Sequence, residues 1–166
     1  MDAGNDFGYV ATYLPQHIIA IRLLIAAILG AIIGFEREVN TAAAGLRTHI
    51  LVALAASLFT ILAFEIYHLV PAGPDGGQSD PIRAVEAVTA GIAFLGAGAI
   101  FRDGGGVQGL TTGAGMWLAG AVGVTAALGY YVIALGVTVL AVIILAALRA
   151  LSHKLVGKEA GVAVKD

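Results

Sequence analysis

The stretch that decides the fold covers residues 94–112 and reads Phe-Leu-Gly-Ala-Gly-Ala-Ile-Phe-Arg-Asp-Gly-Gly-Gly-Val-Gln-Gly-Leu-Thr-Thr. Its apolar first half, spaced by glycines, is typical of a membrane helix that packs closely against another. Arg102, Asp103 and three glycines end this apolar character, which resumes at Leu110. The pattern predicts two membrane helices joined by a short polar connection.

Composition extends this prediction to the whole chain. Of the 166 residues, 59% are hydrophobic and 12% are charged, whereas a soluble domain carries about 25% charged residues. A bilayer crossing takes roughly 20 apolar residues, so the chain has room for four or five crossings. The lipid bilayer is therefore one expected partner. A net charge of -2 argues against nucleic acid as another, and the absence of cysteine excludes disulfides and cysteine-based metal sites.

Apolar runs long enough to span a bilayer occur five times. They lie at about 18–35, 50–70, 84–101, 110–128 and 130–148. We predict an all-α integral membrane protein with a five-helix bundle, forming one transmembrane domain over 1–150, with a short basic cytoplasmic tail over 151–166. Little more than Gly129 and Tyr130 separates the last two runs, which indicates either a tight hairpin or one long broken helix. No basic n-region of a signal peptide precedes the first run, so we expect that run to be retained.

The basic residues predict an orientation in the membrane. Seven of the nine Lys and Arg residues follow the first, third or fifth apolar run, namely Arg37, Arg47, Arg102, Arg149, Lys154, Lys158 and Lys165. Arg83 is the one basic residue in the opposite set of connections. By the positive-inside rule, we expect a bacterial inner-membrane protein with a periplasmic N-terminus and a cytoplasmic C-terminus.

The sequence also resembles itself. The first and third runs end in Phe35-Glu36-Arg37 and Phe101-Arg102-Asp103, and the chain resumes at Gly45-Leu46-Arg47-Thr48 and Gly109-Leu110-Thr111-Thr112. Both connections lie on the predicted cytoplasmic side. This similarity favours two parallel helix-pair repeats followed by a fifth helix, and chance likeness between glycine-rich connections is the alternative.

Two charged residues fall inside predicted helices. Arg22 shares a face of the first helix with Gly30 and Gly34, and Glu86 heads a stripe of small residues on the third. Because an unpaired charge inside the membrane is costly, we predict an intramembrane pair of Arg22 and Glu86. Its role is either functional or only to set the register of the helices. Glu65 lies off the small-residue face of its helix, and we expect its side chain to extend to the interface.

Most of the remaining polar residues lie on the predicted cytoplasmic side. They are Glu36, Arg37, Glu38, Arg47, Thr48, His49, Arg102, Asp103, Gln108, Thr111 and Thr112. If the two connections meet, these residues form one functional polar site, with Asp103 and Glu36 as candidate ligands for a cation such as Mg²⁺. The arginines suit carboxylate or phosphate. The alternative is that the residues only pair among themselves as interface anchors.

Several segments resemble the MgtC/SapB family of bacterial inner-membrane proteins. The matching segments are residues 34–38, 44–49, 91–104 and 109–112, together with Trp117, and the resemblance covers about residues 18–148. It implies a membrane protein tied to magnesium homeostasis and, in pathogens, to survival in the host. The founding member is thought to regulate other membrane machinery, including ATP synthase. MgtC proper has a cytoplasmic C-terminal domain, so this chain is more similar to the shorter SapB-like members.

The expected function is therefore that of a non-enzymatic membrane protein of ion homeostasis, acting as a regulator or as the binding partner of another membrane complex. The alternative is a small ion transporter or channel with a path between the level of Arg22 and Glu86 and that of Asp103. An intramembrane enzyme ranks third, because no nucleophile and base stand together, and no cofactor beyond Mg²⁺ is expected. Glycines at 30, 34, 113, 120 and 123 further predict a homo-oligomer, a dimer.

Overall fold

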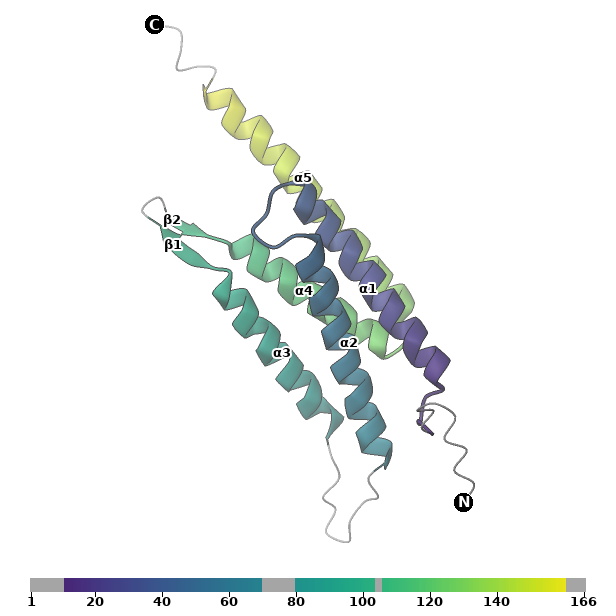
Figure 1. The fold of residues 1–166 in the computed structure, drawn as a ribbon. Helices are drawn as coiled ribbons and strands as arrows, with labels where there is room; N and C mark the ends of the chain where they lie inside the picture. Colours follow the sequence, from purple (N-terminus) through teal and green to yellow (C-terminus); the bar gives the residue numbers. More distant parts are fainter. Residues whose placement is uncertain (1–10, 70–79, 104–105, 161–166) are drawn as a thin grey trace, which may run out of the picture.

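The computed structural model describes residues 11–69, 80–103 and 106–160, with only the backbone described for 103 and 152–160. The described chain contains five helices and one short hairpin (Figure 1). The elements are α1 (Gln16–Val39), α2 (Leu46–Leu69), α3 (Pro81–Gly98), β1 (Phe101–Asp103), β2 (Gly106–Gln108), α4 (Leu110–Ala127) and α5 (Tyr131–Ala160). The predicted all-α architecture of five helices is confirmed.

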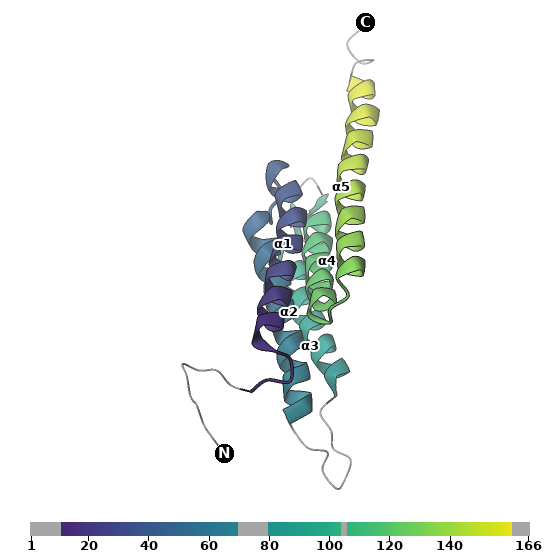
Figure 2. The same ribbon diagram turned by 90° about the vertical axis from the view of Figure 1, so that its right-hand side faces the viewer.

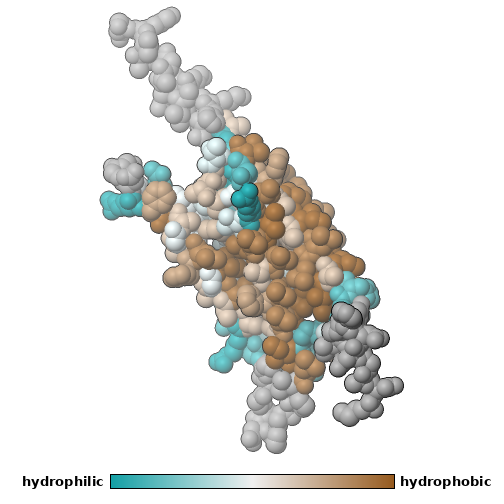
Figure 3. Space-filling model, viewed as in Figure 1, coloured by the Kyte–Doolittle hydropathy of each residue, from teal (hydrophilic) through white to brown (hydrophobic). Residues whose placement is uncertain are grey.

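The helices suit a membrane environment. By length and composition, α1, α2, α4 and the Tyr131–Leu151 part of α5 can each cross a bilayer. The remaining helix, α3, is not among these candidates and carries Arg83 and Glu86 in its first turns. Figure 3 shows a mostly apolar surface over the helices, with hydrophilic residues gathered towards the two ends of the bundle. The fold is that of a multi-pass membrane protein.

The boundaries differ from the prediction where charged residues join a helix. Helix α1 continues through Glu36 and Arg37 to Val39, and α2 begins at Leu46 instead of 50. Helix α5 likewise continues to Ala160, so 151–160, predicted as part of a tail, are helical. A helix predicted from hydropathy ends at the first charged residue. The backbone, however, remains helical until a capping residue or a glycine intervenes.

The connection between α3 and α4 was not predicted as regular structure. Helix α3 ends at Gly98, and β1 pairs with β2 in an antiparallel hairpin in which Arg102 lies opposite Val107. Gly109 returns the chain to α4 with a φ of 83°, a conformation that glycine adopts at little cost. The hairpin extends past the ends of α3 and α4 at one end of the bundle, while α5 reaches further still (Figure 1).

The turn between α4 and α5 is tight. Gly129 has a φ of 85°, and Tyr130 N donates to Thr125 O across the turn. Figure 2 shows α5 running back along α4 in the opposite direction and standing at one side of the bundle. The structure therefore has a tight hairpin between α4 and α5 and not one long broken helix.

Helix α1 approaches α2, and α3 approaches α4, through glycines. A Cβ atom on Gly30 would lie 2.7 Å from His49 O, and one on Gly96 would lie 3.4 Å from Gly113 O. Gly30 and Gly96 each precede a phenylalanine, Phe35 or Phe101, by five residues. Their contact partners, His49 and Gly113, each follow a glycine, Gly45 or Gly109, by four residues. The two helix pairs therefore make their close contact at equivalent positions, which supports the internal repeat.

Glu65 does not extend to the interface as expected. Its side chain is buried, with 6% of the residue exposed, and its carboxylate accepts hydrogen bonds from Tyr13 N at 2.7 Å and Leu14 N at 2.9 Å. The ring of Tyr13 stacks on His68 at a centroid distance of 3.5 Å. Glu65 and His68 thus hold the segment before α1 against α2. The carboxylate of Glu65 pairs two backbone N–H groups that would be costly to bury without a partner.

Candidate functional site

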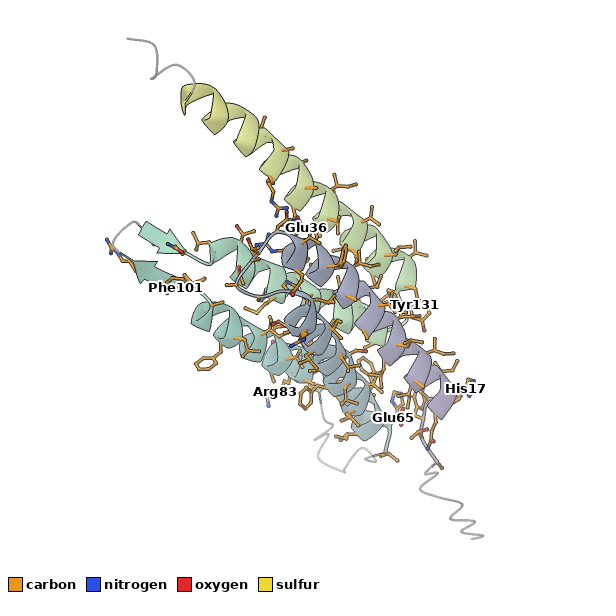
Figure 4. All side chains as sticks on the ribbon, turned by 45° about the horizontal axis from the view of Figure 1, so that its top comes forward. His17, Glu36, Glu65, Arg83, Phe101 and Tyr131 are labelled. Carbon is orange, nitrogen blue, oxygen red and sulfur yellow. The ribbon has the colours of Figure 1, made fainter. Side chains whose placement is uncertain are left out.

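The last turns of α1 meet α5 through an ion pair. Glu36 Oε1 lies 3.0 Å from Arg149 Nη2, and Asn40 Nδ2 donates to the same oxygen at 3.2 Å. The Glu36 side chain is 9% exposed and that of Arg149 is 30% exposed. Figure 4 shows Glu36 at the end of α1 nearest α5 and Phe101 at the same end of the bundle, with Glu65 and His17 at the other.

Arg37 and His49 form the buried part of this end. Arg37 Nη1 lies 3.9 Å from Glu36 Oε2, while Arg37 Nε is buried with no hydrogen-bond partner. His49 is fully buried, and its Nδ1 is 2.8 Å from Gly45 O. Its Nε2 is also buried without a partner and faces Gly115 of α4. Three helices thus enclose a polar cluster, defined here as Glu36, Arg37, His49 and Arg149.

Glu38 has a local structural role. Its Oε2 accepts a hydrogen bond from Leu46 N at 2.9 Å, so the carboxylate satisfies one of the free N–H groups at the start of α2. A negative charge there also interacts favourably with the helix dipole. The carboxylate lies where a side chain on residue 45 would project, which explains the glycine at that position.

The other predicted site residues are distributed unevenly. Arg47, Arg102 and Thr111 are exposed, and Thr48 is half-buried. Thr112 is buried, one turn before Gly115 on α4. The side chain of Asp103 lies outside the described residues. Of the predicted set, the structure brings Glu36 and Arg37 together, and it adds Arg149, which the prediction omitted, and His49 from the wider set of polar residues.

The candidate cation ligand Glu36 has donors on one carboxylate oxygen, whereas its Oε2 is buried without a hydrogen-bond partner, 3.9 Å from Arg37 Nη1. Arg149 and Asn40 both contact its Oε1. Among the residues that the structure describes, no group of three His, Asp or Glu side chains could hold a metal ion. With one carboxylate and two guanidinium groups, the cluster has an excess positive charge when His49 is neutral, and such a site suits an anion better than a cation.

The predicted pair of Arg22 and Glu86 is not formed. Arg22 instead donates to Ala127 O at the end of α4 and packs against Gly129. Glu86 is exposed on α3 and forms no ion pair within the described part of the chain. The carbonyl groups of the last helical turn have no partners within their helix, so Arg22 satisfies one of them and fixes the turn before α5.

Taken together, these features define a polytopic helical membrane protein with a charged cluster at one end of its bundle. Residues 23–154 match the model of the MgtC family, and the chain therefore belongs to the MgtC family. It is 40% identical over 126 residues to Protein MgtC of Brucella abortus (strain 2308), a match that covers 76% of this chain and 49% of that protein.

A second relative gives a similar match. Identity to Protein MgtC of Salmonella typhimurium (strain LT2) is 39% over 120 residues, which covers 72% of this chain and 48% of the relative. The chain thus spans about half the length of the curated relatives it matches. No solved structure matches the chain at a significant level.

Proposed function

We propose that this chain is a non-enzymatic membrane protein of magnesium homeostasis that regulates or binds another membrane complex. The observation that carries the proposal is the polar cluster of Glu36, Arg37, His49 and Arg149, which joins α1, α2 and α5 at one end of the bundle. The exposed Arg47 and Arg102 lie at the same end of the bundle and give it further positive groups for a partner. The names of the relatives agree with a link to magnesium.

The arrangement of the polar groups favours this function over transport. A path from one side to the other needs polar groups in succession, but Arg22 is bonded to Ala127 O and Glu86 points away from the bundle core. Between the two ends, Thr60 and Thr138 direct their hydroxyl groups to carbonyl groups of their own helices. The hydroxyl groups of Thr60 and Thr138 therefore have acceptors. The buried Ser57 hydroxyl has no partner among the described residues, but one such group does not form a chain of ligands for an ion.

Two measurements on the same protein test the proposal. We expect expression of the chain to restore growth at low Mg²⁺ in a bacterium that lacks its own MgtC-family gene, and Arg37→Ala to remove this effect. In proteoliposomes that contain the purified protein alone, a Mg²⁺-sensitive dye should respond no faster than in empty liposomes. Arg83→Ala, on the exposed surface of α3, is the control for growth. Mg²⁺ entry that requires Arg37 would contradict the regulatory function and favour the transporter.

The orientation is a further prediction. Because Arg37, Arg47, Arg102 and Arg149 lie at the end with the polar cluster, whereas Arg83 lies at the start of α3 at the other end, we expect the cluster end to face the cytoplasm. A phosphatase reporter that is active only in the periplasm should be inactive after Ala160 and active when placed before Pro15. The reverse pattern would show that the protein is inserted the other way round.

The homo-oligomer also remains a prediction, but its sequence basis is weaker. The glycines that suggested it, including Gly30, Gly34 and Gly123, already contact other helices of the same chain. In contrast, Gly91, Gly98 and Gly136 have open space where a Cβ atom would lie. A contact between two copies should therefore be sought on the outer faces of α3 and α5.

A further inference from the structure

A groove runs along the outside of α1 at the end of the bundle that holds the polar cluster. It has a volume of about 610 Å³, and most of its lining is apolar. The lining residues are Ile28, Ala31, Ile32, Phe35, Glu36, Val39, Asn40, Leu46 and Val142. The polar groups, Glu36 and Asn40, lie at one end of this set, and the residues at the other end are aliphatic.

The length of the groove matches one leaflet of a bilayer. From Ile28 to Asn40 the chain advances 12 residues along α1 and its C-cap, which corresponds to about 18 Å at 1.5 Å per residue. Half of a hydrocarbon core is about 15 Å thick. A groove of this length with polar groups at the water side fits an acyl chain whose headgroup lies beside Glu36.

Arg149 stands where that headgroup would lie. It follows Val142 by seven residues and so shares a face of α5 with this lining residue. One nitrogen, Nη2, is bonded to Glu36, and the side chain is 30% exposed. A guanidinium group has five N–H donors, so the exposed part of Arg149 still has donors for a phosphate group.

The charge of the cluster selects the class of headgroup. Arg37 and Arg149 flank the single carboxylate of Glu36, which leaves one positive charge in excess. We propose that an anionic phospholipid occupies this groove, with one acyl chain between α1 and α5 and its phosphate on Arg149. Basic pockets between helices on the cytoplasmic side are a recognised setting for anionic headgroups.

A second groove gives an internal comparison. It lies between α2 and α3, has a volume of about 460 Å³, and none of its lining residues is charged. A lipid chain there would meet no charged lining residue that could select its headgroup. The proposed selectivity therefore depends on the groove beside α1, and changes to that groove alone should remove it.

The test measures lipid binding to the purified full chain in detergent by native mass spectrometry. Dioleoyl phosphatidylglycerol is the anionic probe, dioleoyl phosphatidylcholine the neutral one, and inorganic phosphate the headgroup without a chain. We expect one tightly held phosphatidylglycerol. Arg149→Gln should weaken it about tenfold, the loss expected for one charge-assisted hydrogen bond. Arg83→Gln, an exposed arginine in the first turn of α3, should leave binding unchanged.

A second pair of variants leaves the charges intact. Val142→Trp fills the groove and should abolish phosphatidylglycerol binding, whereas Ile144→Trp adds the same bulk on an exposed face of α5. This pair decides the matter even if Arg149→Gln does not fold. Equal affinity for phosphatidylcholine, displacement of the lipid by inorganic phosphate at equal concentration, or unchanged binding in Val142→Trp would each overturn the proposal. A dimer cross-linked through the groove, with lipid excluded, would also overturn it.

Discussion

Replacing Gly30 by alanine is expected to lower the free energy of unfolding by about 3 kcal/mol, near the upper end of the usual cost of overpacking. The added Cβ atom would lie 2.7 Å from His49 O and 2.8 Å from the Cβ of Ala53. The first of these is a backbone atom, which cannot move aside without shifting the whole of α2. Gly30 thus sets the distance between α1 and α2, and through His49 the geometry of the polar cluster.

The measurement is unfolding of the purified protein in mixed micelles with increasing sodium dodecyl sulfate, followed by the fluorescence of Trp117. Gly91→Ala is the matched control, because a Cβ atom on Gly91 would meet nothing within 4 Å. Alanine in a helix interior is favoured over glycine by about 0.5–1 kcal/mol, so this variant should be as stable as the parent or slightly more stable. Equal losses in both variants would mean that α1 and α2 do not approach as the structure has them.

The sequence predicted the number and type of the helices well, because a membrane helix needs a long apolar run that few other structures share. It missed the hairpin of β1 and β2, since each strand has three residues and a run of three glycines, 104–106, includes the start of β2. Strands this short carry no detectable alternation. It also placed the start of α2 too late, because the N–H group of Leu46 is satisfied by Glu38, a contact across the connection.

The candidate site was predicted only in part, for a physical reason. Glu36 and Arg37 stood out because charges at a helix end within the membrane boundary are rare. Arg149 seemed to be one of several basic residues near the C-terminus, and only the packing of α5 on α1 brings it to Glu36. His49 was noticed as polar, but its burial depends on the glycine at 115, which belongs to another helix.

The prediction for Arg22 failed because sequence periodicity gives the face of a helix but not the partner. A carboxylate is the obvious partner for an arginine in the membrane, whereas the structure supplies the carbonyl group of Ala127 at a helix end. Helix ends contribute acceptors that no residue type reveals. Glu65 shows the same effect, since its partners are backbone N–H groups of the segment before α1.

Removing the charge of Glu36 should be the most damaging single change in the polar cluster. Glu36→Gln keeps the size of the side chain but leaves Arg37 and Arg149 without a carboxylate, in a place where Arg37 is 8% exposed. Loss of one partner from a buried pair costs about 3–5 kcal/mol, and the partial exposure of Arg149 favours the lower end. Glu38→Gln is the control, because it alters an exposed cap contact worth about 1 kcal/mol.

The double variant Glu36→Gln with Arg149→Gln separates the ion pair from other effects. If the two side chains interact directly, the double variant should be more stable than the sum of the single losses predicts, by about 1–3 kcal/mol. Detergent unfolding of the four proteins gives this coupling energy. If the losses simply add, α5 is not held to α1 by this pair. In that case Arg149 would be free to act only on groups outside the chain, and the polar cluster would consist of α1 and α2 alone.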